Sequence, residues 1–163
     1  MSLAGGLAAC AYEDQEEPQT TPAGPSQRSA RTIPPKDPDV LAVEARNYAE
    51  LDQRLAKAAG SVLLADAGPA DGPGVGFRKA ATVVTAGPHT VTAACVGIPH
   101  AQINVSQDTV GGTEEEVFEL DCSGTTTQVL QLQKGYVGAQ LLARRDPTGP
   151  WTGAVAGIKI TAG

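Results

Sequence analysis

The chain has 163 residues, of which 19 are Gly and 12 are Pro, and this frequency of chain-breaking residues excludes a long coiled coil. Only 2 Phe, 1 Trp and 3 Tyr are present, so a core has to be built from Val, Leu, Ile and Ala, and aromatic binding platforms are scarce. Twelve Lys and Arg against 18 Asp and Glu give a net charge of −6, whereas nucleic-acid binding requires a basic surface. We therefore expect no nucleic-acid partner. No apolar run approaches the roughly 18 residues of a membrane-spanning helix.

Residues 1–10 are mostly small and apolar, and they end in a cysteine. The run Leu7-Ala8-Ala9-Cys10 resembles a bacterial lipobox, in which a signal peptidase cuts before a cysteine that carries a diacylglycerol. The resemblance implies lipidation of Cys10 and attachment to a membrane through two or three acyl chains, because one chain anchors only marginally. The first basic residue is Arg28, although a secretory signal needs a basic region before its apolar stretch. We therefore expect residues 1–10 to be the remnant of a longer signal. The alternative is a disordered terminus with an incidental cysteine.

Residues 11–37 are rich in Pro, begin with an acidic cluster and contain almost no large apolar side chains. Such a segment cannot bury enough surface to offset the entropy lost on ordering. We predict a disordered, acidic tether, which extends by about 3.1 Å per residue where Pro keeps it straight. A tether of this kind would hold a folded domain several nanometres away from a membrane anchor.

A helix is predicted over residues 38–60. Asp37 is a good N-cap, Pro38 suits the first helical position, and Gly60 suits the C-cap. Apolar residues recur at helical spacing: Leu41, Ala45, Tyr48, Leu51, Leu55 and Ala59. Charged residues fill the other faces: Glu44, Arg46, Glu50, Asp52, Arg54 and Lys57. We expect the apolar stripe to pack on the following domain; the alternative is a stalk or a helix that docks to a partner.

Residues 61–163 change to the period of two that is typical of β-strands. After a short first run over 61–65 and a loop over 66–76, alternating segments follow at 77–85, 90–96, 101–106, 117–122, 127–133, 136–144 and 153–161. Gly- and Pro-containing turns separate these seven strands and a possible eighth, and the short connections favour antiparallel pairing. The fold class is therefore mainly β, an antiparallel sandwich that follows one amphipathic helix.

Alternation also predicts which side chains face the core. The inward set is Val91, Ala93, Cys95, Ala101, Ile103, Val105, Phe118, Leu120, Cys122, Leu130, Leu132, Val137, Ala139, Leu141, Ala143, Ala154, Ala156, Ile158 and Ile160. The outward set is Thr92, Asn104, Glu119, Gln131, Gln140 and Lys159. Both cysteines of the β segment are inward. In an exported protein, Cys95 and Cys122 would form a disulfide worth about 3.6 kcal/mol of stability; in a cytosolic protein they would be two buried thiols.

Three stretches of the β segment carry a family resemblance: His89-Thr90-Val91-Thr92-Ala93-Ala94-Cys95-Val96-Gly97, Phe118-Glu119-Leu120-Asp121-Cys122-Ser123-Gly124 and Gly153-Ala154-Val155-Ala156. With them, residues 77–163 resemble the small disulfide-bearing β-sandwich domains of uncharacterised lipoproteins from high-GC Gram-positive bacteria. This architecture is shared by jelly-roll carbohydrate-binding modules. The resemblance implies a jelly-roll-like fold, and such folds host unrelated functions.

Few residues suggest chemistry. His89 and His100 have no third metal ligand nearby, so we expect no metal site and no cofactor. The run Glu114-Glu115-Glu116 is expected in a solvated hairpin turn, and Asp66 and Asp71 match no calcium-loop signature. No nucleophile elbow or phosphate-binding loop occurs.

Two aromatic residues are candidates for ligand binding, Tyr136 and Trp151. A lone Trp more often closes the end of a sandwich than serves as a stacking anchor. The sequence therefore predicts an extracytoplasmic lipoprotein whose β-sandwich binds a cell-wall polysaccharide, another extracellular polymer or a protein, without catalysis. The alternatives are a hydrolase of unrecognised type and a structural subunit that docks through its helix.

Overall fold

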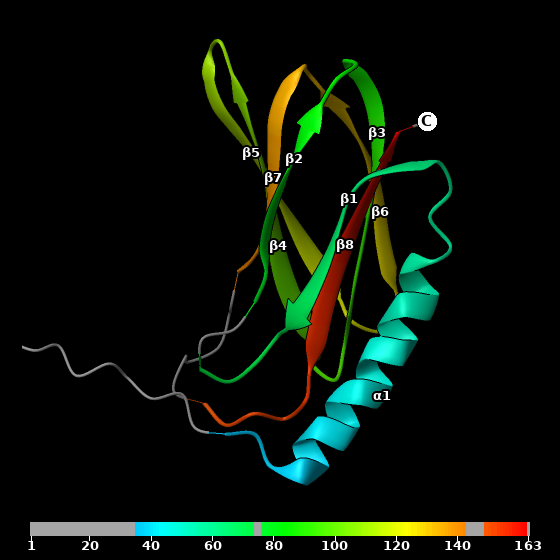
Figure 1. Cartoon of the computed structure of the whole chain (residues 1–163), viewed down its shortest axis with the longest axis vertical. Helices are drawn as coiled ribbons and strands as arrows, with labels where there is room; N and C mark the ends of the chain where they lie inside the picture. The colour runs from blue at the N-terminus through cyan, green and yellow to red at the C-terminus, as the bar shows by residue number, and fades with distance from the viewer. Residues whose placement is uncertain (1–34, 74–75, 143–148, 163) are drawn as a thin grey trace, which may run out of the picture. The chain divides into compact units, whose positions relative to one another are not determined.

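The computed structural model describes residues 35–73, 76–142 and 149–162, in which one helix is followed by eight strands (Figure 1). The predicted signal remnant with Cys10, and residues 11–34 of the predicted tether, lie outside the described residues. The elements are α1 (Pro38–Leu55), β1 (Ser61–Pro69), β2 (Arg78–Val83), β3 (Gly87–Val96), β4 (His100–Thr109), β5 (Gly112–Asp121), β6 (Thr125–Leu132), β7 (Gly135–Leu142) and β8 (Val155–Ala162). The helix and the strands belong to one unit, residues 33–163.

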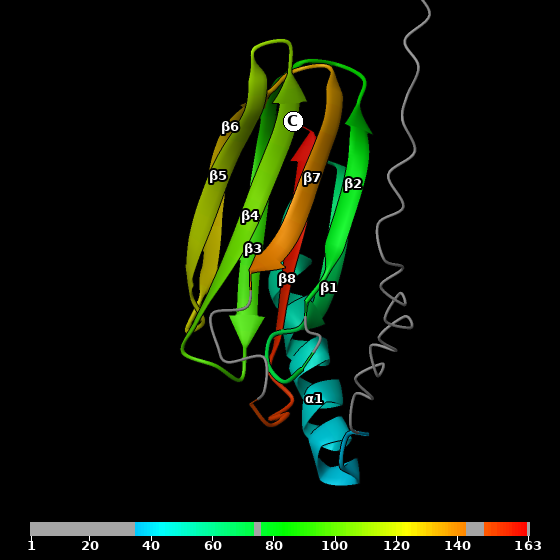
Figure 2. The same ribbon diagram turned by 90° about the vertical axis from the view of Figure 1, so that its left-hand side faces the viewer.

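The strands form two four-stranded sheets that pack face to face (Figure 2). One sheet has the order β1-β8-β3-β6, the other has the order β2-β7-β4-β5, and all neighbours are antiparallel. The structure therefore confirms the predicted antiparallel β-sandwich. Strand pairing extends further than expected. β1 continues through residues 66–69, which were expected to be a loop, because they pair with β8 as far as Val155.

The core between the sheets contains nearly all the side chains that alternation predicts. Val91, Ile103 and Ile158 are fully buried, while Leu130 is half-buried and Ala143 lies outside the described residues. One outward prediction is wrong: Thr92 is only 3% exposed. Thr92 lies on the same face of β3 as Ala94, and this face is covered by α1.

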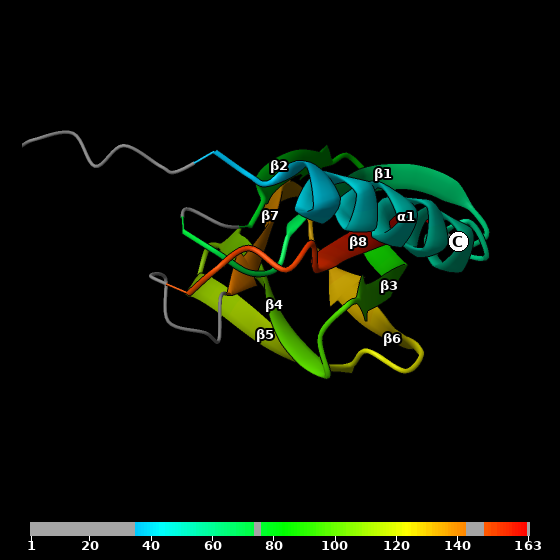
Figure 3. The same ribbon diagram turned by 90° about the horizontal axis from the view of Figure 1, so that it is seen from below.

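The helix α1 lies against the outer face of the sheet β1-β8-β3-β6 (Figure 3). Its Leu51 and Leu55 pack with Ala94, Val96 and Val155 in a second apolar cluster. β3 and β8 are therefore buried on both faces. Among the described residues, no helix is long and apolar enough to cross a membrane.

The contact face of the helix is rotated from the predicted stripe. Leu41 is 49% exposed and Ala45 is also exposed, whereas Glu44 is buried and forms an ion pair with Lys36 at 2.5 Å. Asn47 Nδ2 donates to the Gly153 carbonyl at 2.8 Å. Polar partners outside the helix thus contribute to the packing of this side of it, and they do not show in helical periodicity.

The helix also ends earlier than expected. It stops at Leu55 with Ala56 as its C-cap, rather than near Gly60. The chain must turn back at this point, since Ser61 already pairs with Ala162 in β8. Gly60 makes the turn with a φ of +100°, and a Cβ at this position would lie 2.3 Å from the Ala162 carbonyl oxygen.

The disulfide between Cys95 and Cys122 is present, with a Cα–Cα distance of 4.8 Å. It joins the end of β3 to the residue that follows β5, so it ties one sheet to the other. Arg54 of α1 reaches the same place: its Nη1 donates to the carbonyl oxygens of Cys95 at 2.9 Å and Cys122 at 2.8 Å. The disulfide, both sheets and the helix therefore meet at one corner of the molecule.

Candidate functional site

The outer face of the sheet β2-β7-β4-β5 has no helix over it in the described part of the chain, and it carries a groove of about 480 Å³. We call this groove the trough. Its lining residues come from all four strands: Arg78, Lys79, Ala80, Asn104, Ser106, Asp108, Glu115, Tyr136, Val137, Gly138, Ala139 and Gln140. A volume of this size is within the range of small-ligand sites.

Strand register explains why the trough runs across the strands. Ala80 of β2 pairs with Gly138 of β7, which pairs with Ser106 of β4, which pairs with Glu115 of β5. The first three are small, and a Cβ at Gly138 would already lie 3.1 Å from Ser106 Oγ. This row is the floor, and it crosses four strands, a span of about 14 Å at the usual strand spacing.

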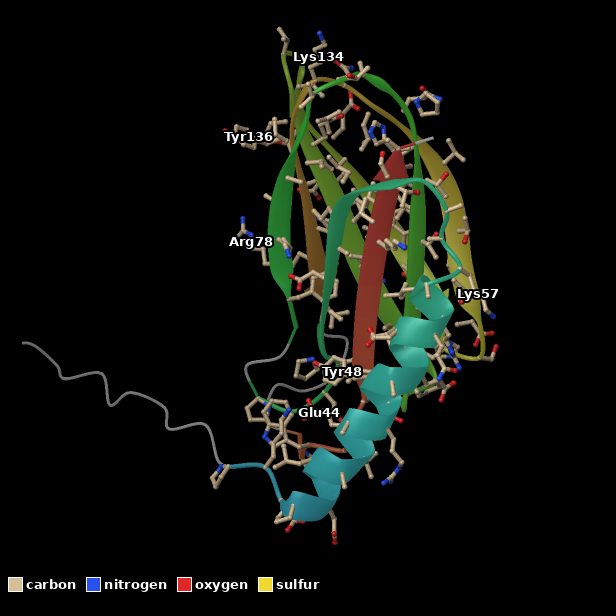
Figure 4. All side chains as sticks on the ribbon, turned by 45° about the vertical axis from the view of Figure 1, so that its right-hand side comes forward. Glu44, Tyr48, Lys57, Arg78, Lys134 and Tyr136 are labelled. Atoms are coloured by element: carbon tan, nitrogen blue, oxygen red, sulfur yellow. A yellow bond between two sulfur atoms is a disulfide. The ribbon has the colours of Figure 1, made fainter. Side chains whose placement is uncertain are left out.

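Larger side chains from the neighbouring rows form the walls. On one side lies Tyr136, which pairs with Thr82; on the other lie Arg78, Gln140 and Asn104, which are register partners. Figure 4 shows Tyr136 and Arg78 projecting from the same face of the sheet, away from α1. Tyr136 is 68% exposed, so one of the two predicted ligand-binding aromatic residues borders the trough and is accessible.

The polar groups of the trough suit hydrogen bonding to a hydroxyl-rich ligand. Asn104 Oδ1 is buried without a hydrogen-bond partner among the described residues, although its side chain lies on the trough. Charges of both signs are present, with Arg78 on β2 and Glu115 on β5. Asp108 accepts a hydrogen bond from Thr113 Oγ1 at 2.9 Å. The alternation of β4 and β7 places Asn104 and Gln140 outward, but only the register shows that they share one groove.

The second predicted aromatic residue, Trp151, lies at the other end of the sandwich, just before β8. The backbone of Gly72 packs directly on its ring, because a Cβ at this glycine would lie 2.2 Å from a ring carbon. Lys36 Nζ, which forms the ion pair with Glu44, also lies 4.3 Å from the centroid of the Trp151 ring. This arrangement favours a packing role for Trp151 near the start of the helix. Trp151 and Tyr136 therefore do not belong to one site.

Asp71, which was considered as a calcium ligand, has a structural role beside Trp151. It is 3% exposed, and its Oδ2 accepts hydrogen bonds from the Thr152 backbone N–H at 2.7 Å and from the Thr152 hydroxyl. Asp66 lies in β1, where it accepts from the Ala67 N–H. The two aspartates therefore have separate local partners.

The other candidate residues for chemistry do not come together. His89 lies inside β3 and is buried, with Nδ1 3.0 Å from the Gly87 carbonyl oxygen. His100 is exposed at the start of β4, and β3 separates the two histidines by roughly 20 Å. Glu114 to Glu116 lie within β5, not in a turn, because the strand extends to Gly112 in its pairing with β4. The described residues contain no group of three or more His, Cys, Asp or Glu side chains that could hold a metal ion.

Comparison of the whole chain with protein-family models, with curated proteins and with solved structures finds no match. The fold and the trough are therefore the basis for assigning a function. The residues that matter most in the trough, Ala80, Ser106 and Gly138, carry no signature that a motif search would recognise. Two features identify them. Alternation places each of the three residues on the outer face of its strand, and the register between the strands then aligns them in one row.

Proposed function

We propose that this chain is an exported, membrane-anchored lipoprotein whose trough binds a polysaccharide outside the cell without catalysing its cleavage. The observation that carries the proposal is the geometry of the trough: an accessible tyrosine ring stands beside a floor of small side chains. An aromatic ring stacks on the apolar face of a sugar, while carboxamide and guanidinium groups bind its hydroxyls. The length of the floor accommodates a short run of linked sugar rings.

The character of the trough favours a glycan over a protein partner. Protein interfaces usually centre on several buried aromatic or aliphatic anchors, whereas the trough has Tyr136 as its single aromatic residue and small or polar side chains elsewhere. Both signs of charge are represented, so the trough suits a polymer without a high net charge. The proposal therefore concerns a largely neutral polysaccharide.

The extracytoplasmic address is supported by the disulfide, because structural disulfides persist in oxidising compartments. Lipidation of Cys10 belongs to the same proposal. Intact-mass analysis of the native protein from membranes tests both, with an acylated Cys10 and a disulfide as the expected result. Recovery of the native protein from the cell interior with all three thiols reduced would contradict the address.

A polysaccharide array probed with the full chain tests the binding function. For the best soluble oligosaccharide, Tyr136→Ala should weaken binding about tenfold or more, equivalent to about 1.4 kcal/mol. Tyr136→Phe should retain most of the affinity because it keeps the ring, and Gly138→Leu should abolish binding by filling the floor. Val129→Ala is the control, since Val129 is 57% exposed on the other sheet. An array without binding, or binding that both Tyr136→Ala and Gly138→Leu leave intact, would contradict the proposal.

The two alternative functions receive less support from the same geometry. The buried apolar residues of α1, Leu51 and Leu55, already pack on the chain's own sheet, so they are not free to dock to a partner. The two histidines, which a hydrolase could use, do not come together: His89 is buried near the start of β3, and His100 is exposed at the start of β4. We therefore place the function in the trough.

A further inference from the structure

The four edge strands of the sandwich are protected to different degrees. β1 has an irregular register between Val62 and Leu64 and ends at a proline, β2 begins with Arg78 and Lys79, and β5 carries five acidic residues. Bulges, prolines and charges are the devices by which proteins keep edge strands from pairing with other chains. Three of the four edges therefore carry such a device.

β6 is the exception. Its sequence, Thr-Thr-Thr-Gln-Val-Leu-Gln-Leu, contains no charge, no Pro and no Gly. It pairs with β3 along its whole length and is the last strand of its sheet. Its outer row of backbone N–H and C=O groups is thus available to a further strand, and its β-branched side chains favour extended pairing.

A cavity of about 220 Å³ lies beside this edge, between β6 and the edge strand β5 of the other sheet. Figure 2 shows the two strands along the same flank of the sandwich. Leu130, Leu132 and Val105 give the cavity apolar walls, and Glu114 and Glu116 stand on its β5 side. Towards the β5–β6 turn, a hydrogen bond of 3.3 Å from Gln128 Nε2 to Glu116 Oε1 joins the two strands.

We propose that the edge of β6 binds an extended, basic segment of a partner protein as a fifth strand of its sheet. Alternate side chains of such a strand point inward, towards this cavity. A Lys or Arg at these positions can lay its aliphatic stem against Leu130 and Leu132 and bring its charge to Glu114 and Glu116. The recognised segment therefore carries basic residues at every second position.

Charge favours this occupant over a second copy of the same chain. Pairing β6 with β6 would bring the glutamates of two copies to one interface, and each chain has a net charge of −6. A basic strand would instead neutralise them. Glu115 is the one lining residue that this cavity shares with the trough, so the proposal does not depend on the proposed polysaccharide function.

The test uses the full chain and a synthetic peptide of alternating Val and Lys, eight residues long to match β6. Titration at low salt should give saturable binding, and hydrogen exchange should show new protection of β6 amides. The same peptide with N-methyl groups on alternate residues keeps its charge but cannot pair along its backbone. It should bind at least about tenfold more weakly.

Paired variants separate recognition from general charge attraction. Glu114→Gln with Glu116→Gln should weaken peptide binding about five- to tenfold, because two partly exposed ion pairs are lost. The control is Glu50→Gln with Glu119→Gln, which makes the same charge change at two glutamates that do not line the cavity and should change affinity less than about twofold. Val129→Lys, which places a charge on β6 itself, should also weaken binding.

Four results would overturn the proposal. Equal binding of the N-methylated peptide would mean charge attraction without strand pairing, and equal loss in the two glutamate pairs would mean that the cavity is not involved. Concentration-dependent protection of β6 without peptide would assign the edge to a second copy of the chain. A peptide that does not bind overturns it as well.

Discussion

The two sheets of the sandwich have similar inner faces and very different outer faces. Outside β3 and β8, the residues include the small apolar side chains of Ala94, Val96 and Val155, and α1 covers them. Outside β4 and β7, the residues include Ser106 and Gln140, and the face is open as the trough. The comparison indicates a division of labour: one outer face is used for stability and the other is available to a ligand.

The largest expected effect concerns the link between the two sheets. Replacing Cys95 and Cys122 by Ala removes the disulfide that joins β3 to the end of β5, and it should lower the free energy of unfolding by about 3.6 kcal/mol. Urea denaturation followed by circular dichroism measures the change. Cys10→Ala is the control and should leave stability unchanged. A loss below about 1 kcal/mol in the double variant would mean that the sheets hold together without the disulfide.

The next effect tests the covered face alone. Leu51 is fully buried between α1 and its sheet, so Leu51→Ala should destabilise the fold by about 3 kcal/mol. Leu41→Ala makes the same change on the same helix at a side chain that is 49% exposed, and it should cost under about 0.5 kcal/mol. Below the unfolding transition, neither change should alter oligosaccharide affinity. A Leu51→Ala variant with weakened affinity would show that the two outer faces are coupled.

Arg54 offers a smaller perturbation at the corner where helix, sheets and disulfide meet. Arg54→Met keeps the aliphatic stem but removes the donors to the Cys95 and Cys122 carbonyls, and it should cost about 1–2 kcal/mol. The partner of Arg54 on the helix surface, Glu50, is half exposed, and Glu50→Gln should cost under about 0.5 kcal/mol. Chemical denaturation of the two variants side by side measures the difference. Equal costs would assign the role of Arg54 to its surface ion pair.

The smallest effect is a pH dependence at the end of β5. The Ser123 backbone N–H, at 3.0 Å from Oδ1, together with the Ser123 side chain and the nearby His100, lowers the pKa of Asp121 below its usual value. A lowered pKa in the folded state means that the carboxylate stabilises the fold at neutral pH, and that this contribution fades as the pH falls below about 4.

Asp121→Asn removes this contribution. It should lower the urea midpoint slightly at pH 7, and the difference from the unaltered protein should shrink towards about pH 2 as the Asp121 carboxylate takes up a proton. Denaturation curves at the two pH values measure this. A difference that persists unchanged in acid would mean that the turn depends on the shape of the side chain rather than on its charge.

Alternation in the sequence was sufficient to predict the sandwich and its inward residues, because a period of two is a local property. It placed Cys95 and Cys122 inward, but their disulfide was predicted only for an exported protein. It could not predict that Thr92 is buried or that Glu44 faces the sheet, because both depend on where a helix docks. The contacts of Arg54, predicted only to lie off the apolar stripe, were out of reach for the same reason: its backbone acceptors Cys95 and Cys122 lie 41 and 68 residues away in the chain.

The trough was harder to predict than the fold. Alternation places Tyr136 and Gln140 outward. Gln140 belongs to the predicted outward set, and Tyr136 is one of the two predicted ligand-binding aromatic residues. The floor depends on Ala80, Gly138 and Ser106 falling into one row, which is a property of the register between strands far apart in sequence. Composition alone did not indicate that three small residues would align.

The central claim is that the open face of β2-β7-β4-β5 is the ligand-binding face. Nuclear magnetic resonance titration of the isotope-labelled chain with the best oligosaccharide from the array tests it most directly. We expect saturable shifts of the amide resonances of Ala80, Ser106, Tyr136 and Gly138, with little change in α1, β3 and β8. Shifts centred on the helix-covered sheet, or no saturable shift with any oligosaccharide, would contradict it.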